Sequence, residues 1–166
     1  MGITKSGDTT EQLVLELCPS AKANPDRSGK GKAKGDVIFS TPQGEEFYVE
    51  VKKTTWNQTR PSKYIPIVGL CDGQWYVVPP HEIVKKCLGR KGQHTPNPLV
   101  CIGLGKPKMS GWWYNFAVKT SDLEKEIIKA HRKGQKHTKF KKFAQESMAQ
   151  VLKLIERQQK TLERLV

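Results

Sequence analysis

The segment from Glu46 to Lys53 alternates between apolar and polar side chains, and this alternation constrains the fold more than any other feature. Successive side chains of a β-strand point to opposite faces, so the segment predicts a strand with one buried face. The residues on that face are Phe47, Val49 and Val51. Glu50 and Lys52 share the opposite face, two residues apart.

The segment before this strand predicts its antiparallel partner. Asp36–Ser40 is rich in β-branched and aromatic residues, and Thr41–Gly44 has the composition of a turn. In a hairpin that turns there, Asp36 lies across from Glu50 to Lys52. Gly35 precedes Asp36, and a glycine allows the backbone to approach a ligand closely. The hairpin therefore predicts that Asp36, Glu50 and Lys52 converge on one spot.

Two carboxylates and a lysine at one spot suit the hydrolysis of a phosphodiester bond. Carboxylate oxygens bind a hard divalent cation, which neutralises developing charge, and the backbone carbonyl of Val51 is a further candidate ligand. Lys52 is expected to stabilise the charged transition state and to help deprotonate the attacking water. The alternative is a solvated Glu/Lys pair on an exposed sheet face, which many strands carry.

Asp36, a short strand and turn, and Glu50-Val51-Lys52 resemble the motif of the PD-(D/E)XK nuclease superfamily, over about residues 9–80. The resemblance is strongest to a small type II restriction endonuclease. It implies an α/β (α+β) fold, with a restriction-endonuclease-like central mixed sheet flanked by helices. It also implies Mg²⁺, with Mn²⁺ as a substitute, held by Asp36 and Glu50, and makes Lys52 the catalytic lysine.

Many members of the superfamily also place a glutamate of the first helix near the metal. Glu11 and Glu16 are the candidates here, and Glu16 is the preferred one. The sequence departs from the family pattern at two points. Gly35 stands where the family has a proline before the aspartate, and no strand signature separates the first helix from Asp36.

The rest of the chain predicts a single domain over residues 1–166, with a helical C-terminal region over about 121–166. Expected helices are Thr9–Leu17, Pro80–Leu88, Ser121 to about Lys133, and about Lys139 to the C-terminus. The third is expected to begin at the capping box Ser121-Asp122-Leu123-Glu124 and to end at Gly134. Further strands are expected at Tyr64–Cys71, Trp75–Val78 and Val100–Leu104, with Trp112–Val118 as an edge strand and Ser20–Gly35 as a loop.

The formal net charge of +13 favours a polyanionic partner, and the nuclease motif makes DNA, most simply double-stranded, the expected one. Polar and basic residues on both sides of the hairpin are expected to contact it. These residues are Lys30, Lys32, Lys34, Lys53, Thr54, Asn57, Gln58, Arg60 and His94. Residues 119–142 hold nine Lys/Arg against three acids and predict a second phosphate-binding face.

Apolar residues near the C-terminus recur at three- and four-residue spacing and predict a homodimer seam, with one polar position. They are Met148, Val151, Ile155, Gln158, Leu162 and Leu165. The four cysteines have no paired or zinc-binding spacing, and no segment has the length and apolarity of a membrane span, so an intracellular, cytoplasmic protein is expected. Three functions stay open: a restriction-type endonuclease, a structure-specific nuclease such as a Holliday-junction resolvase, and a non-catalytic nucleic-acid-binding protein.

Overall fold

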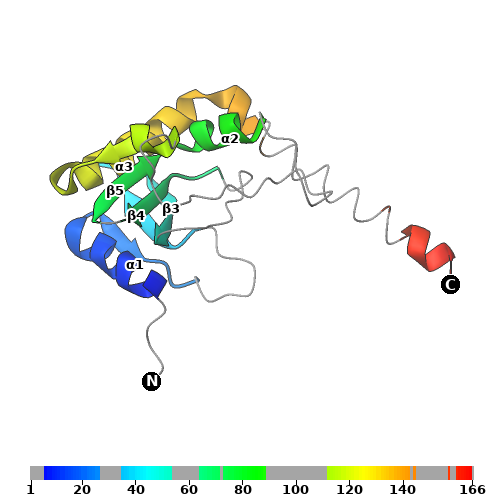
Figure 1. Cartoon of the computed structure of the whole chain (residues 1–166), viewed down its shortest axis with the longest axis horizontal. Helices are drawn as coiled ribbons and strands as arrows, with labels where there is room; N and C mark the ends of the chain where they lie inside the picture. Colours follow the sequence, from blue (N-terminus) through cyan, green and yellow to red (C-terminus); the bar gives the residue numbers. More distant parts are fainter. Residues whose placement is uncertain are drawn as a thin grey trace, which may run out of the picture.

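A mixed sheet flanked by helices forms the framework, as shown by a computed structural model that describes residues 6–26, 35–53, 64–71, 73–88, 112–142, 144, 157 and 160–165 (Figure 1). The strands, in sheet order, are β1 (Ala21–Ala23), β2 (Val37–Ser40), β3 (Glu46–Lys53), β4 (Ile67–Cys71), β5 (Gln74–Val78) and β6 (Ala117–Val118). The helices are α1 (Ser6–Leu17), α2 (Pro80–Leu88) and α3 (Leu123–Lys136), with short 3-10 helices η2 (Trp112–Phe116) and η3 (Thr120–Asp122). The predicted α+β class is confirmed.

The hairpin predicted from the alternating segment is present. β2 pairs with β3 in antiparallel register, with Val37 opposite Val49 and Ser40 opposite Glu46. In the turn, the N–H of Thr41 donates to the Glu45 carbonyl at 2.8 Å. Gly44 has a φ of 86°, which a residue with a side chain rarely adopts, so a glycine is required at this turn position.

β3 changes its partner halfway along its length. Its first half pairs with β2, whereas Glu50 to Lys53 pair with Ile67 to Leu70 of β4. The β3–β4 pair is parallel, while the other strand pairs of the described sheet are antiparallel. From Glu50 onward, the side of β3 that faced β2 is therefore available to something other than a strand.

The apolar face of β3 forms the centre of the core. Phe47, Val49 and Val51 are at most 6% exposed and belong to one cluster with residues of α1, α3, β4 and β5. The other members of that cluster, including two residues of β2 and Cys18 just after α1, are Val14, Cys18, Val37, Phe39, Val68, Trp75, Val77, Leu123, Ile127 and Ala130. Burying each large apolar side chain contributes about 1.5–3 kcal/mol. This packing fixes which face of β3 is left for Glu50 and Lys52.

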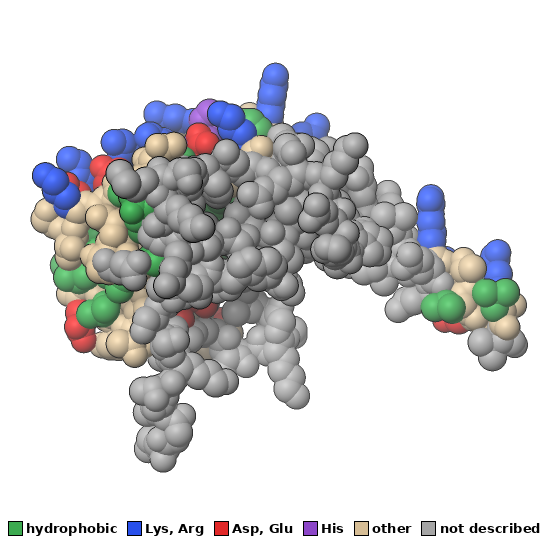
Figure 2. Space-filling view, in the orientation of Figure 1, with side chains coloured by type: hydrophobic (Ala, Val, Ile, Leu, Met, Phe, Trp, Pro, Cys, Tyr) green, Lys and Arg blue, Asp and Glu red, His purple; other side chains and the backbone are tan. Residues whose placement is uncertain are grey.

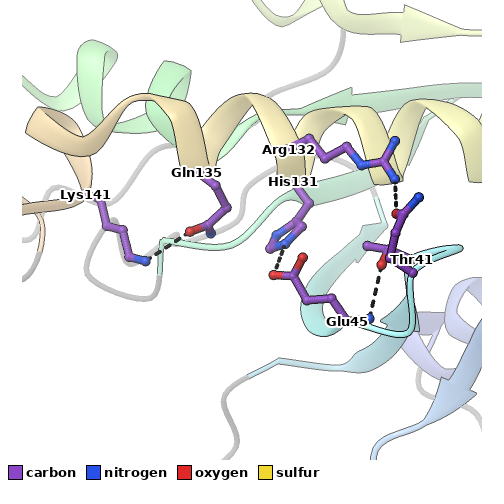
Figure 3. A network of polar contacts seen from close by, with 7 residues as sticks. Thr41, Glu45, His131, Arg132, Gln135 and Lys141 are labelled. Atoms are coloured by element: carbon purple, nitrogen blue, oxygen red, sulfur yellow. Dashed lines mark hydrogen bonds and ion pairs between the residues drawn. The ribbon is translucent and has the colours of Figure 1, made fainter.

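A small polar network attaches α3 to the β2–β3 turn (Figure 3). The His131 ring lies parallel to the Phe47 ring at 4.0 Å between centroids, and its Nε2 lies 3.0 Å from Glu45 Oε1. Arg132 donates to the side-chain oxygen of Gln43, and the Thr41 hydroxyl accepts from the Glu45 N–H at 3.1 Å. The turn end of the hairpin is thus held against α3.

The expected Ser20–Gly35 loop contains a strand that the sequence reading missed. β1 pairs antiparallel with β2, with Ala21 opposite Phe39 and Ala23 opposite Val37. Three residues are too few for alternation to be visible, and the pairing depends on the β2 backbone rather than on local sequence. Asn24 follows β1 and donates to the Gly35 carbonyl at 2.7 Å, which ties the end of β1 to the start of β2.

The expected edge strand Trp112–Val118 is also mostly wrong. Residues 112–116 form η2, and only Ala117 and Val118 pair with β5, with Val118 opposite Trp75. The position at the sheet edge was correct. Tyr114 of η2 contacts Tyr76 edge-on at 5.8 Å between ring centroids, so aromatic packing replaces the strand ladder there.

The expected boundaries of the third helix were wrong at both ends. The capping box does not form, because Asp122 is the N-cap and makes no side-chain cap bond. Glu124 instead accepts hydrogen bonds from the backbone N–H and the hydroxyl of Ser20, which links α3 to the start of β1. α3 also continues past Gly134 to Lys136, because a Cβ on Gly134 would lie 2.3 Å from Pro80 Cγ of α2 and the glycine serves packing.

Other boundaries agree closely with expectation. The first helix begins at Ser6 rather than Thr9 and ends before Pro19, and α2 starts at Pro80 as expected. Of the expected last helix, residues 139–142, 144, 157 and 160–164 are helical, and most of the remainder lies outside the described residues, as does Val100–Leu104. No helix in the described ranges combines the length and the apolar character that crossing a membrane requires.

Candidate active site

The candidate site lies where β3 leaves β2 and takes β4 as its partner. Asp36 immediately precedes β2, and its N–H donates to the Val49 carbonyl at 2.9 Å. The N–H of Val51 donates in turn to Asp36 Oδ2 at 2.8 Å. A carboxylate therefore takes the position that a β2 carbonyl would otherwise hold, and the predicted placement of Asp36 beside the Glu50-Val51-Lys52 segment is confirmed.

Glu50 and Lys52 lie side by side on the polar face of β3. Lys52 Nζ is 3.0 Å from Glu50 Oε1, and the two side chains are only 20% and 15% exposed. An ion pair on a fully solvated face contributes little and holds long side chains loosely. This pair is largely shielded from solvent, unlike the solvated pair considered as the alternative, so the carboxylate and the ammonium are held at a defined spacing.

Two glycines shape the space around these groups. A Cβ on Gly35 would lie 2.8 Å from Tyr48 Cβ and 3.1 Å from the Val49 carbonyl oxygen, so Gly35 allows close contact with β3. Gly35 thus helps to position Asp36 beside β3, and its expected role in approaching a ligand stays a prediction. Gly69 is the register partner of Lys52, and a Cβ there would meet only the Lys52 carbonyl oxygen, at 3.8 Å. Gly69 leaves open space beside Lys52.

The two helix-1 glutamates lie in different environments. Glu16 is exposed and accepts a hydrogen bond from Gln12 at 3.3 Å. Glu11 is 8% exposed, three residues before the fully buried Val14. At about 100° per residue, Glu16 lies about 140° around α1 from Glu11. The placement favours Glu11 over the preferred Glu16 as the helix-1 carboxylate that faces the protein interior. The three-residue spacing to an apolar core position was the sequence signal for this.

The carboxylates of the candidate site can serve a divalent cation only together with water and substrate oxygens. Among the described residues, no group of three or more His, Cys, Asp or Glu side chains is close enough to form a metal site by itself. Mg²⁺ does not require such a group, because it keeps several waters and binds through one or two carboxylates plus substrate oxygens. Asp36 and Glu50 fit that pattern. The side chain of Val51 is buried on the apolar face, so only its backbone carbonyl can take part.

Most of the residues expected to contact DNA lie outside the described part of the structure. Lys53 belongs to β3 and pairs with Leu70, but its side chain is outside the described part of the structure. The others fall wholly outside it: Lys30, Lys32, Lys34, Thr54, Asn57, Gln58, Arg60 and His94. These residues stay predictions.

Three buried groups of the described residues outside the proposed catalytic set have shifted pKa values. Burial raises the pKa of Cys18 to about 12, with the Glu124 carboxylate adding to the effect, and burial raises the pKa of Tyr64 to about 12. The Tyr64 hydroxyl donates to the Gly134 carbonyl at 2.7 Å. Burial, and then the imidazole of His137 stacked on it at 4.0 Å, lower the pKa of His81. Cys18 and Cys71 are buried.

Comparison of the chain with models of known protein families, with curated proteins and with solved structures gives no match.

Proposed function

We propose that this protein is a Mg²⁺-dependent endonuclease that hydrolyses phosphodiester bonds of DNA, with Asp36, Glu50 and Lys52 as its catalytic residues. The observation that carries the proposal is the hydrogen bond from the Val51 N–H to Asp36 Oδ2 at 2.8 Å, beside the Lys52–Glu50 pair at 3.0 Å. A binding protein without catalysis has no need for a carboxylate anchored on the backbone of a strand that carries a second carboxylate and a shielded lysine.

Each of these side chains has a part that follows from its position. Asp36 and Glu50 would hold the cation, and the bond from Val51 fixes one oxygen of Asp36 so that little ordering is needed when the cation binds. The bound cation would supply charge neutralisation at the phosphate and a more acidic water. Lys52 places a positive charge beside the reacting phosphate and stabilises the negative charge that develops there.

The fold offers further support. β1 supplies a short strand between α1 and Asp36, which is the element that the resemblance to PD-(D/E)XK nucleases implies and the sequence did not reveal. The buried Glu11 of α1 extends the proposal to a helix-1 carboxylate near the metal. The mixed sheet flanked by helices is consistent with a restriction-endonuclease-like fold. We include this fold in the proposal.

Plasmid cleavage with different divalent cations tests the reaction. We expect cutting with Mg²⁺ and Mn²⁺, and no cutting in EDTA. Ca²⁺ should support binding without cutting, because its looser coordination holds the attacking water poorly. Robust cutting in EDTA would refute the metal mechanism, and a purified protein that binds DNA but never cuts it would favour the non-catalytic alternative.

The same assay separates the two kinds of nuclease. Discrete fragments from a linear plasmid indicate sequence-specific double-strand cleavage of restriction type. This is the activity that we favour. Cutting confined to cruciform or branched DNA indicates a structure-specific nuclease such as a junction resolvase.

A homodimer is part of the restriction-type proposal, because cutting both strands calls for two sites. Of the predicted seam, Leu162 and Leu165 lie in the described residues and are 64% and 79% exposed, as an unpaired dimer helix would present them. The other seam positions lie outside the described part. The molecular mass from light scattering decides between monomer and dimer, and a monomeric mass at all concentrations would remove the dimer from the proposal.

A further inference from the structure

The outer face of α3 carries a continuous row of cations. Its five members recur at helical spacing and are Lys125, Lys129, Arg132, Lys133 and Lys136. The opposite face of the helix is buried through Leu123, Ile127 and Ala130. Figure 2 shows Lys and Arg side chains gathered along the edge of the molecule where α3 lies in Figure 1. The row is therefore a surface feature fixed in position by the packing of its own helix.

Three of these cations have no acidic partner among the described residues. Within the described residues, Lys125, Lys133 and Lys136 form no ion pair with an acid, whereas Lys129 lies 3.7 Å from Glu126. Glu124, the other acid at the row, is engaged by Ser20. Three exposed ammonium groups on one helix face repel one another, and this repulsion is relieved when they meet an anionic partner.

The row borders a groove of about 610 Å³, which is lined by all five cations together with Pro42, Ile128 and Glu124. Pro42 belongs to the β2–β3 turn, and that turn is held against α3 by the His131–Glu45 and Arg132–Gln43 contacts (Figure 3). Both walls are thus fixed before any partner arrives. The groove is a built surface rather than a chance gathering of mobile lysines.

This surface is separate from the candidate active site. The groove lies at the turn end of the hairpin, whereas Lys52 lies six residues along β3 from Glu46, a distance of about 20 Å at 3.3 Å per residue. α3 also packs against the apolar face of β3, and Glu50 and Lys52 occupy the other face. A phosphate at Lys52 cannot be the phosphate that these lysines contact.

We propose that the α3 cation row binds the phosphodiester backbone of duplex DNA as a second contact surface, independent of the metal and of the reacting phosphate. From Lys125 to Lys136 the row extends about 16 Å at 1.5 Å per residue. One DNA strand presents a charge about every 3.4 Å along the helix axis, so the row runs beside about five phosphates. A straight row of this length matches a duplex better than a small anion or a short acidic peptide. The proposal rests on the proposed function for its choice of DNA.

Binding in EDTA tests this surface without any cleavage. The variant is the triple substitution Lys125→Gln, Lys133→Gln and Lys136→Gln, and the full chain is titrated with a labelled duplex at several salt concentrations. The matched control is Lys85→Gln, Arg157→Gln and Lys160→Gln, which removes the same charge from exposed cations outside residues 119–142. Each phosphate contact contributes about 0.9 to the slope of log K against log salt, so the α3 variant should lose about 2.7 from the slope.

We expect the slope of the control variant to differ from the wild-type slope by no more than about 0.9, the value of one phosphate contact. Both variants should have the melting temperature of the wild-type protein. Equal slopes for the two variants overturn the proposal, and so does a wild-type protein that does not bind duplex DNA in EDTA. Binding to phosphatidylserine vesicles in place of DNA, with loss in the α3 variant, also overturns it and assigns the surface to a membrane. Cleavage with Mg²⁺ is scored separately, so loss of the proposed nuclease activity and loss of this surface are distinguishable.

Discussion

The two halves of β3 perform different tasks although they share one alternating pattern. In the first half, Glu46 to Val49 pair with β2. The turn that precedes them is held to α3 by the contact between His131 and Glu45. In the second half, Glu50 to Lys53 pair with β4 instead, and the Val51 N–H bonds to the Asp36 side chain. The ion pair of the first half, Lys22–Glu46, is exposed, whereas the Lys52–Glu50 pair of the second half is largely shielded from solvent.

The difference shows why a change of strand partner is a suitable place for a reactive site. Where β2 runs beside β3, the β3 N–H groups that point toward β2 are used by its backbone carbonyls. Where β2 has diverged from β3, a backbone donor becomes available to a side chain, and the rigid sheet then fixes that side chain. The three predictions that follow test whether the two halves differ in this way.

Asp36→Asn, Glu50→Gln and Lys52→Met should each lower the cleavage rate by about a thousandfold or more, because a charge at the reacting phosphate is lost. The matched control is Glu46→Gln in the first half, whose carboxylate pairs with Lys22 on the exposed surface. Its rate should stay within about twofold of wild type. Rates are measured with excess Mg²⁺ on plasmid DNA.

Asp36→Asn is the informative variant of the three, because the amide oxygen can still accept the Val51 N–H while the charge is gone. Its melting temperature should stay close to that of wild type. Near wild-type cutting by any of the three variants would remove that residue from the site.

Gly35→Ala should destabilise the protein by about 1–3 kcal/mol and lower cleavage as well, because its Cβ would press on Tyr48 and displace Asp36. Gly69→Ala is the control in the same sheet, since its Cβ meets only one atom at ordinary contact distance. Urea unfolding should show Gly69→Ala equal to wild type or more stable by about 0.5 kcal/mol. Equal stability of the two variants would contradict the proposed role of Gly35 in placing Asp36.

His131→Ala should cost about 1–2 kcal/mol of stability, chiefly through the lost packing on Phe47, because its partner Glu45 is 59% exposed. The cleavage rate of the folded protein should be unchanged, since the first half of β3 takes no part in the reaction. The measurement is urea unfolding together with a cleavage assay well below the midpoint. A rate loss above about tenfold would show that the two halves are coupled.

Local sequence predicted those elements whose conformation depends on their own residues, such as a strand with alternating apolar side chains or a turn with a glycine. The hairpin was readable because Phe47, Val49 and Val51 must share one face and Gly44 must turn the chain. The opposition of Asp36 and Glu50 followed from the length of the turn. β1, η2 and the end of α3 were not readable, because each depends on a partner distant in sequence: β2 for β1, Tyr76 for η2, and Pro80 for Gly134.

The sequence by itself determined which face of β3 is apolar and which residues bear charge at its end, since a two-residue period leaves one arrangement that buries Phe47, Val49 and Val51. The tertiary structure decided what those charges do. Only the departure of β2 and the arrival of β4 make the Val51 N–H available to Asp36 and shield the Glu50–Lys52 pair. The placement of Glu11 in the interior likewise depends on how α1 packs, because a helix presents several faces and the core selects one of them.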